Sequence, residues 1–491
     1  MKKRMGIGGG LALAALLAVP GAAFAQGNGI GALGSQLDTT WVMVACVLVL
    51  FMQAGFLLLE IGFSRQKNVG AGVAKVLVNL AVVTLAWWAV GFGISSLTGN
   101  KIFGTDGFFF HAGQEIGTGA DAFVVGGGDT ALMLFGMLFC AVSLAIVWGT
   151  TLERIRFAAY AIYAAVFGAV IYPLVAHGVY GGGLLSDVGG KPVMDFAGSS
   201  VVHLTGAVGA LAALLLLGPR LGKYGADGRS RAIPGHSMPL VGLGVIILFF
   251  GWFGFNPGST LAITDTRLAD VAVVTLMGAA GGVIGAFVAT QIKQRTIDIG
   301  MVGNGMIAGL VAITAPSGYV EAWTAPIIGL VAGVIVVVGV ILIDRKLDDP
   351  VGALSAHGLA GIWGTLACGI FTAPRFAQYN AFGDPDGGLI YSGSFTQLAT
   401  QAIGVVIAFS FVFSMSYVTF WAIKKTIGLR VTDEQEDAGL DIVEHGMYGY
   451  PEQFIPAPEI GAGSTGPAAP AYAGGGTAAT VSAMTPAEVT R

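Results

Sequence analysis

The sequence predicts an all-α polytopic membrane protein with eleven transmembrane helices, arranged as two five-helix inverted repeats and a peripheral eleventh helix. Of its 491 residues, 55% are hydrophobic and only 11% are charged, whereas about a quarter are charged in soluble domains. Eleven apolar windows are each long enough to cross a bilayer, which takes about 20 residues. Similar histidine-containing segments also occur once in each half.

Residues 1–25 have the features of a cleavable secretory signal. Lys2, Lys3 and Arg4 precede a short apolar run, which ends in an A-x-A site at Ala25. This order of basic start, apolar core and small residues is typical of a signal peptide. We therefore expect cleavage after Ala25 and a mature N-terminus outside the cytoplasm.

The remaining apolar windows define a transmembrane domain over residues 26–426. Repeat one covers about 40–220, repeat two about 237–373, and helix eleven about 397–424. Because five is odd, the second set of five helices enters the membrane from the opposite side, as in many transporters with inverted repeats. The windows are centred near Leu50, Val83, Leu144, Val166, Leu211, Leu248, Ala279, Ile307, Val334, Ile362 and Ala408.

The distribution of basic residues gives the orientation. The loops predicted to be external hold only Lys101, Lys191, Arg267 and Arg375, and the loops on the other side hold many more lysines and arginines. Cytoplasmic loops carry this excess, so the N-terminus is expected outside and the C-terminus inside.

Two further segments follow helix eleven. Residues 427–455 are polar and acidic with interspersed apolar residues, which suits a cytosolic segment that docks on the cytosolic loops or a solvated extension. Residues 456–491 are rich in Gly, Ala, Pro, Ser and Thr and are predicted to be disordered.

Composition also argues against several classes of function. The net charge of -4 and the lack of a basic patch argue against nucleic-acid binding. Cys46, Cys140 and Cys368 all fall inside predicted spans, where small buried thiols are more common than disulfides or metal ligands. We expect no metal site and no cofactor.

Two intramembrane histidines are the strongest candidates for a functional site. His203 follows Asp195 by eight residues, and His357 follows Asp349 by the same distance. A single intramembrane histidine often only forms a hydrogen bond between helices, but an ionisable residue in each repeat favours one shared site. A facing pair of imidazoles is suited to line a path for a small polar molecule or to relay a proton. Bis-histidine haem ligation is a remote alternative.

The two aspartates are interpreted differently. Topology places Asp195 near the outer end of the fifth span, where it either caps the helix or attracts and orients a cation. Asp349 lies near the inner end of the tenth span and precedes Pro350. An acidic residue before proline is typical of an ordinary helix start, so Asp349 is predicted to be a cap.

An aromatic run, 249–259, ends the sixth span at the predicted outer face. Aromatic residues there are commonly interface anchors. The functional alternative is a cage whose ring faces replace the hydration of a cation. Tyr180, Phe135 and Phe139 are candidates to complete such a cage.

Several segments resemble the ammonium transporter (Amt/Mep/Rh) family, in its bacterial Amt form, and they follow the family order from about residue 40 to 446. The matching segments are Arg65-Gln-Lys67-Asn68, Glu153-Arg-Ile-Arg-Phe157, Asp195-Phe-Ala-Gly-Ser through Gly218-Pro-Arg220, Gly251-Trp-Phe-Gly-Phe-Asn256, Asp348-Asp349 to His357-Gly358, and Gly428-Leu-Arg-Val.

The resemblance implies roles for residues along a pore. His203 and His357 match the twin histidines that line the family's pore. Phe139 and Phe255 match the stacked phenylalanines of its outer gate, and Phe135 lies one helical turn from Phe139.

The resemblance also implies a recruitment site for ammonium. Ser259 matches the serine that accepts a hydrogen bond from the ion, Asp195 matches the family's essential aspartate, and Trp252 matches a vestibule tryptophan. Tyr180 stands where related bacterial transporters carry tryptophan. Tyrosine is the weaker cation-π partner.

Like Tyr180, Glu60 departs from the family pattern. Leu59-Glu60 stands where some members have two aromatic residues near the pore. We interpret Glu60 as structural, with Arg65 or Lys67 as its partner.

The function that the resemblance implies is an ammonium transporter or channel, not an enzyme. It recruits ammonium outside, deprotonates it and conducts ammonia into the cytoplasm, with possible separate proton transfer, and it accepts methylammonium as an analogue. The family also implies a homotrimer in the lipid bilayer of the bacterial cytoplasmic (inner) membrane, and a cytosolic face that a PII signalling protein plugs. An ammonium sensor with little transport is the alternative function.

Overall fold

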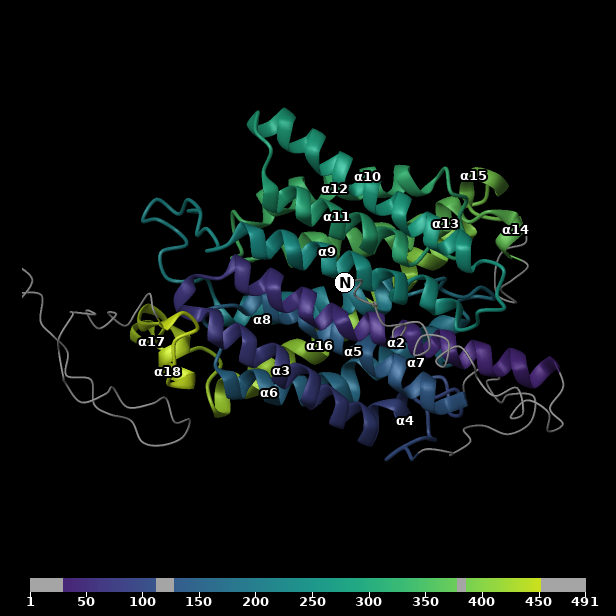
Figure 1. The fold of residues 1–491 in the computed structure, drawn as a ribbon, viewed down its shortest axis with the longest axis horizontal. Coiled ribbons are helices and arrows are strands. Elements are labelled where there is room, and N and C mark those ends of the chain that lie inside the picture. The colour runs from purple at the N-terminus through teal and green to yellow at the C-terminus, as the bar shows by residue number, and fades with distance from the viewer. Residues whose placement is uncertain (1–29, 112–127, 378–385, 452–491) are drawn as a thin grey trace, which may run out of the picture.

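The computed structural model describes residues 30–111, 128–377 and 386–451, so the predicted signal peptide and the predicted disordered tail lie outside the described residues. The described residues form helices joined by loops, with isolated β-bridges and no strand (Figure 1). Ten helical spans among them are long and apolar enough to cross a membrane, and an eleventh apolar helix, α11, is shorter. The all-helical fold class is confirmed.

Several spans are built from consecutive helical segments. A π-helical turn interrupts the second and the fourth span, and a π-helical segment begins the fifth and the tenth. The first five spans are α2 (Ile30–Phe63), α3 (Val69–Ala86) with η3 (Trp87–Gly91) and α4 (Phe92–Ser95), α5 (Gly128–Thr151), α6 (Phe157–Val166) with η5 (Phe167–Ile171) and α7 (Tyr172–Tyr180), and η7 (Ser199–Leu204) with α8 (Thr205–Leu217).

The next five spans and the last one follow the predicted windows. They are α9 (Met238–Phe255), α10 (Leu268–Gln294), α11 (Ile299–Thr314), α12 (Ala325–Ile343), η9 (Leu354–Leu359) with α13 (Ala360–Phe371), and α16 (Thr396–Thr426). Short helices lie in the loops and after α16: η2 (Gln66–Asn68), η6 (Leu184–Ser186), η8 (Pro257–Thr260), α14 (Pro374–Ala377), α15 (Leu389–Ser392), α17 (Asp433–Ala438) and α18 (Leu440–His445).

Helix packing reflects the two repeats. The second and fourth spans of each repeat pack together, as α3 with α6 and as α10 with α12. The third and fifth spans also pair, as α5 with α8 and as α11 with α13, and the two first spans, α2 and α9, pack along each other. The fifth spans interlock, since η7 contacts α13 and η9 contacts α8. Helix α16 packs across α8 and α13.

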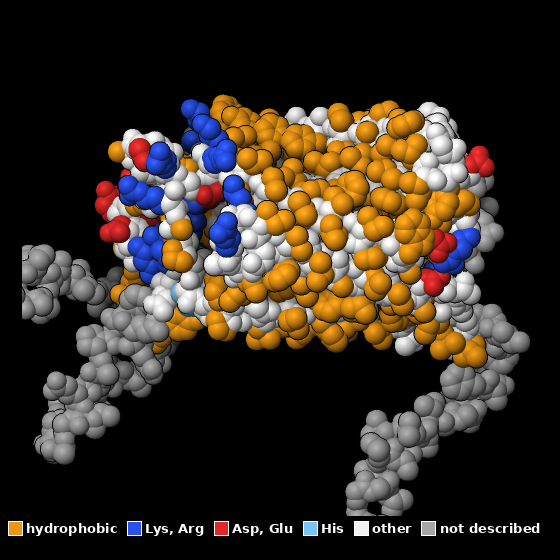
Figure 2. Space-filling view, turned by 90° about the horizontal axis from the view of Figure 1, so that it is seen from above, with side chains coloured by type: hydrophobic (Ala, Val, Ile, Leu, Met, Phe, Trp, Pro, Cys, Tyr) orange, Lys and Arg blue, Asp and Glu red, His pale blue; other side chains and the backbone are white. Residues whose placement is uncertain are grey.

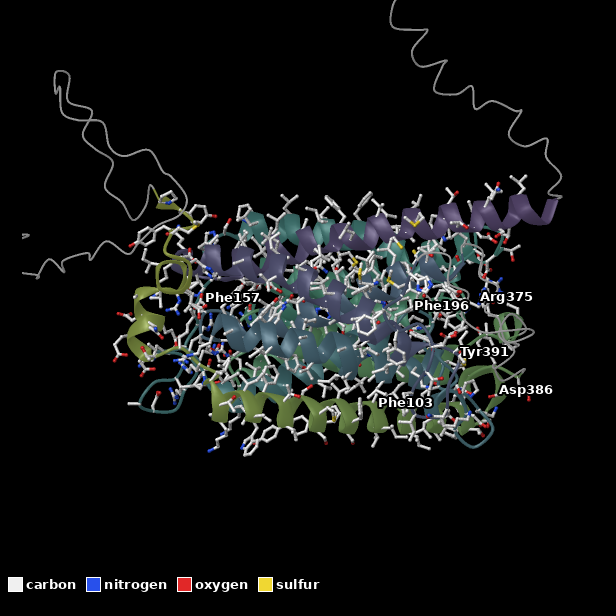
Figure 3. All side chains as sticks on the ribbon, turned by 90° about the horizontal axis from the view of Figure 1, so that it is seen from below. Phe103, Phe157, Phe196, Arg375, Asp386 and Tyr391 are labelled. Atoms are coloured by element: carbon white, nitrogen blue, oxygen red, sulfur yellow. The ribbon has the colours of Figure 1, made fainter. Side chains whose placement is uncertain are left out.

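The two ends of the bundle differ in charge. A broad hydrophobic band covers the middle of the molecule, and lysine and arginine side chains gather at one end (Figure 2). Helices α17 and α18 lie at this end (Figure 1), which we call the tail end. Phe157 lies at the tail end, whereas Phe196, Arg375 and Tyr391 lie at the opposite end (Figure 3).

Glycine allows the closest helix contacts in the second repeat. A Cβ atom added to Gly329 of α12 would lie 2.0 Å from the carbonyl oxygen of Gly278 in α10, and one added to Gly282 would lie 2.2 Å from the carbonyl oxygen of Gly305 in α11. Small residues permit this approach between membrane helices. Hence α10, α11 and α12 pack backbone to backbone.

One predicted boundary and one predicted span length differ from the structure. Helix α2 begins at Ile30, about ten residues before the predicted start of repeat one, because polar residues there remain helical: the Thr39 hydroxyl bonds the Ser35 carbonyl within the same helix. Helix α11 has 16 residues, which gives about 24 Å at 1.5 Å per residue. It is therefore shorter than the hydrocarbon core of about 30 Å.

Candidate functional site

The two histidines meet inside the bundle. His203 Nδ1 lies 3.2 Å from His357 Nδ1, and the two rings stack with their centroids 5.2 Å apart and their planes at 19°. His203 is fully buried and His357 is 5% exposed. One histidine comes from each repeat, so the structure brings together the pair that the sequence singled out. Rings in direct contact leave no space for a porphyrin between them, which argues against the haem alternative.

Asp195 positions His203 because it starts the helix that carries this histidine. Its two carboxylate oxygens accept four backbone N–H bonds of 2.7–2.9 Å from residues 198–201. Gly198 has φ +114°, a backbone conformation that favours glycine, and this turn lets the N–H groups converge. Asp195 is only 3% exposed. The structure therefore makes Asp195 a helix cap whose charge is already saturated with hydrogen bonds.

Asp349 has the same role in the other repeat. Its Oδ1 accepts from the Gly352 N–H at 3.0 Å and its Oδ2 from the Leu354 N–H at 2.8 Å. Gly352 has φ +74°, matching the glycine turn ahead of η7. The predicted cap is confirmed, and the predicted contrast between the two aspartates is weaker than expected because both cap a histidine-bearing helix.

The three phenylalanines predicted as a gate lie together on the His203 side of the histidine pair. The rings of Phe139 and Phe255 stack with centroids 4.0 Å apart and planes at 5°. Phe135 follows at 4.3 Å from Phe139, tilted by 39°, and Phe255 lies 5.4 Å from His203. The order from the histidines outward is therefore Phe255, Phe139, Phe135.

Trp252 lies deeper than its predicted vestibule role implies. Its side chain is fully buried and stacks on His203, with centroids 5.3 Å apart and planes at 16°. The indole N–H donates to the Thr314 hydroxyl at 3.0 Å. Trp252 therefore holds the His203 ring in place.

The other two predicted recruitment residues are not joined into a cage. The Ser259 hydroxyl donates to the Phe255 carbonyl at 2.8 Å, which places it one turn beyond the phenylalanine stack. Tyr180 is 41% exposed at the end of α7. Among the described residues its ring has no contact with the three phenylalanines.

Glu60 does not pair with the residues predicted for it. Arg65 bonds Glu153 instead, with Nε–Oε2 at 2.6 Å, and Lys67 approaches Asp437 at 3.8 Å. These arginine and lysine side chains follow the end of α2 and point toward neighbouring loops, whereas Glu60 is 1% exposed inside the bundle. The predicted partners of Glu60 were therefore wrong.

A buried charge network at the tail end was not predicted from the sequence. Arg220 forms a bidentate pair with Asp348, at 2.9 Å for both bonds, and approaches Glu153 at 3.6 Å. Burial raises the pKa of Asp348, but hydrogen bonds from Arg220 and the charge of Arg154 outweigh it, so that pKa falls to about 2. For Glu153, burial is likewise outweighed by Arg220 and Arg65, and its pKa is lowered. The spacing of these charged residues in the sequence does not indicate the network, because they come from separate loops.

The segment after α16 docks on this network. Glu436 accepts from the Leu221 N–H at 2.7 Å and from Arg430 at 2.5 Å. Asp441 accepts from the Ala71 N–H at 2.8 Å, and the Leu440 N–H donates to Asn68 at 2.9 Å. Of the two interpretations of this segment, docking on the loops of the tail end is the one that the structure shows for residues up to 451.

Comparison with known proteins gives the family. The family model described as Ammonium Transporter Family matches residues 40–450. Ammonium transporter Amt2 of Archaeoglobus fulgidus is 42% identical over 84% of this chain and 88% of its own length. A putative ammonium transporter of Synechocystis is 38% identical over the same shares. The chain belongs to the ammonium transporter family.

Solved structures agree with this assignment. A sensor Amt protein superposes with a TM-score of 0.76 at 33% identity, covering 84% of this chain and 99% of the other. Mep2 of Candida albicans superposes with a TM-score of 0.73 at 28% identity, covering 81% and 87%. The resemblance drawn from the sequence is confirmed.

Proposed function

We propose that this protein recruits ammonium at the end of the bundle opposite the tail end, removes its proton near the phenylalanine stack, and conducts ammonia past His203 and His357 into the cytoplasm. The observation that carries this proposal is the order of the buried groups. A stack of aromatic rings leads directly to two joined imidazoles, which is a path for a small polar molecule and an unfavourable one for an ion.

The orientation rests on charge. Basic side chains gather at the tail end (Figure 2), and cytoplasmic faces carry this excess. The tail end therefore faces the cytoplasm, and the phenylalanine stack faces outward. In a bacterium this membrane is the inner membrane, and a signal peptide at residues 1–25 fits an external mature N-terminus.

Recruitment depends on Tyr180 and Ser259, with Trp252 behind them. Tyr180 offers an exposed aromatic face, and such faces attract cations by about 0.5–1 kcal/mol at exposed sites. Asp195 supports recruitment through its field and through the helix that it starts, since its oxygens are occupied by backbone N–H groups.

Deprotonation follows from the cost of burying a charge. An isolated ion loses far more hydration in an apolar passage than a few ring faces return. Ammonium escapes this cost by losing its proton, and potassium has no such route. His203 and His357 then offer ring nitrogens to ammonia and form a chain along which a proton moves separately.

Transport is tested with purified protein in liposomes. Inward gradients of ammonium and of methylammonium should each produce a transported signal, measured as internal pH change and as current, that empty liposomes lack. Potassium should give none. Absence of both ammonium signals in a well-folded preparation would contradict the proposal.

A second candidate, an ammonium sensor, is favoured by the sensor Amt protein among the structural neighbours. In that case, ammonium would bind and change the docking of residues 427–451 while flux stays at the level of empty liposomes. Binding without flux in the same assay separates the two functions.

Assembly and regulation complete the proposal. We infer a homotrimer in the bilayer with one pore per subunit, and a PII signalling protein as the partner of the tail end. The docked α17 and α18 leave a folded cytosolic face for such a partner. Size determination in detergent tests the trimer, and co-purification with a PII protein tests the partner.

A further inference from the structure

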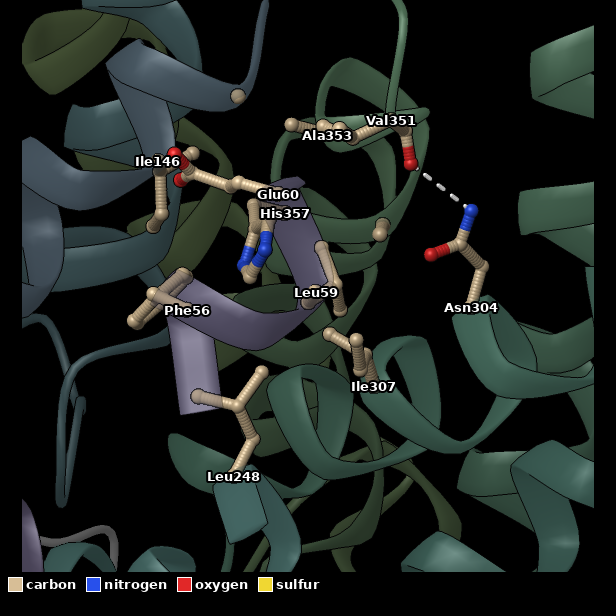
Figure 4. Close-up of a pocket in the computed structure, with 12 residues that line it drawn as sticks. Phe56, Leu59, Glu60, Ile146, Leu248, Asn304, Ile307, Val351, Ala353 and His357 are labelled. Carbon is tan, nitrogen blue, oxygen red and sulfur yellow. Dashed lines mark hydrogen bonds between the residues drawn. The ribbon is translucent and has the colours of Figure 1, made fainter. Parts of the chain in front are cut away.

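A small cavity lies on the tail-end side of the histidine pair. It has a volume of about 20 Å³ and lies among α2, α5, α9, α11 and the segment leading into η9 (Figure 4). Phe56, Leu248 and Ile307 form apolar walls, and His357 and Glu60 both line it. A cavity of this size holds about one water-sized molecule.

Glu60 is a polar residue of this cavity whose carboxylate has an oxygen without a hydrogen-bond partner among the described residues. Its side chain is 1% exposed, and its Oε2 has no hydrogen-bond partner among the described residues. A buried carboxylate oxygen without a partner is costly. Glu60 therefore presents a strong acceptor to whatever occupies the cavity.

The polar groups near Glu60 bond to other partners and leave its Oε2 without one. Lys75 of α3 is buried as well. The Tyr160 hydroxyl donates to the Lys75 carbonyl at 2.8 Å rather than to the carboxylate. The Asn304 amide donates to the Val351 carbonyl at 2.9 Å (Figure 4).

His357 completes the site from the other side. Its Nδ1 is joined to His203, which leaves Nε2 as the ring nitrogen for a molecule in the cavity. An imidazolium N–H and a carboxylate oxygen that line one water-sized cavity form a donor and an acceptor that a single small molecule bridges.

We propose that Glu60 and His357 bind one small hydrogen-bonding molecule, ammonia or water, between them, and that Glu60 accepts the proton that the histidine pair carries inward. The inference rests on the proposed passage of ammonia. In this step the His357 imidazolium gives a proton to the bridging molecule, which gives one of its own to the Glu60 carboxylate. The products are neutral imidazole, an unchanged bridging molecule and a neutral carboxylic acid, which releases the proton to water at the tail end.

The test uses Glu60→Gln, which keeps the shape and the hydrogen bonding but cannot accept a proton. Ammonium-evoked current in proteoliposomes should fall by at least about tenfold, because a positioned proton acceptor is lost, while ammonia permeation measured by internal pH stays within about twofold. Glu60→Asp, which keeps the carboxylate, should retain most of the current. Thr151→Val serves as the control, since its buried hydroxyl bonds only its own helix.

The outcomes separate this inference from the proposed function. A Glu60→Gln current equal to wild type overturns the proton step, and so does an equal loss of current and permeation, which would make Glu60 merely structural. Wild-type ammonia permeation without any current also overturns it but keeps ammonia conduction. No permeation in wild type rejects the proposed function instead.

A further arm identifies the bridging molecule. A pH gradient is imposed on ammonium-free liposomes and the proton current is measured. A current that Glu60→Gln abolishes assigns the bridge to water, and a Glu60-dependent current that appears only with ammonium assigns it to ammonia. Lack of dependence on Glu60 under both conditions contradicts the site.

Discussion

In one half of the candidate site, Asp195 starts the short helix that carries His203, and in the other half Asp349 starts the helix that carries His357. The residue ahead of each aspartate is anchored by a side chain from another part of the fold. Gln401 donates to the Met194 carbonyl at 2.7 Å, whereas Arg154 donates to the Asp348 carbonyl at 2.7 Å.

The anchors of the two halves differ in charge. A neutral amide anchors the η7 half, and a buried network of arginines and carboxylates anchors the η9 half. Past the histidines, aromatic rings pack on His203, and a cavity with Glu60 adjoins His357. The repeat thus gives two histidines in equivalent positions, and their surroundings differ on the two sides.

Removing the charge of the η9 half should have the largest effect on stability. Asp348→Ala leaves Arg220 buried without its bidentate partner, which costs about 3–5 kcal/mol. At the equivalent position, Met194→Leu should cost less than about 1.5 kcal/mol. Chemical unfolding in detergent micelles measures both, and similar values for the two variants would remove the contrast between the halves.

The neutral anchor should matter less. Gln401→Leu removes bonds to Met194 N, Met194 O and the Thr365 carbonyl and should cost about 1–3 kcal/mol, because these groups are left buried without partners. Thr419→Val on the same helix, whose hydroxyl bonds only the Met415 carbonyl, is the control. A Gln401→Leu cost above that of Asp348→Ala would reverse the assignment of the stronger anchor.

Acid should destabilise the η9 half selectively. The pKa of Asp348 is lowered from 3.8 to about 2 in the folded protein, so its contribution of about 2 kcal/mol is present above about pH 4 and lost as the pH falls toward about 2. Thermal unfolding across this range should show a steeper loss for wild type than for Asp348→Asn. Identical pH profiles would contradict the pairing.

The two caps should differ by the smallest amount. Asp195→Ala removes four backbone bonds and should cost about 2 kcal/mol, and Asp349→Ala should cost about 1 kcal/mol. Both variants are compared by the same unfolding measurement, with the Asn variants as partial replacements. A larger cost for Asp349→Ala would show that the number of hydrogen bonds does not set the strength of these caps.

Much of the fold was predictable because hydropathy reports directly on membrane spans. The eleven windows agree with the helices, and α16 (Thr396–Thr426) lies close to the predicted 397–424. The pairing of His203 with His357 also followed, since an inverted repeat places equivalent residues at its centre. Boundaries such as Ile30 did not follow, because helical hydrogen bonding continues beyond the apolar window.

The surroundings of the site were less predictable because they depend on loops distant in the chain. Arg65 follows Glu60 closely in sequence, yet Glu153 binds it. Asp195 and Asp349 have the same spacing to their histidines, and topology alone suggested unlike roles, whereas backbone geometry makes both of them caps. Trp252 was matched to a vestibule tryptophan, but its packing on His203 depends on how α9 rotates.

In the proposed mechanism ammonium loses its proton before it reaches the histidines, and the selectivity of the current between ammonium and potassium decides whether this step occurs. Ammonium- and potassium-evoked currents are measured in proteoliposomes for wild type and for His203→Ala combined with His357→Ala. We expect an ammonium current with no potassium current in wild type, and loss of that ammonium current or of its selectivity over potassium in the double variant. Equal ammonium and potassium currents in wild type would contradict deprotonation.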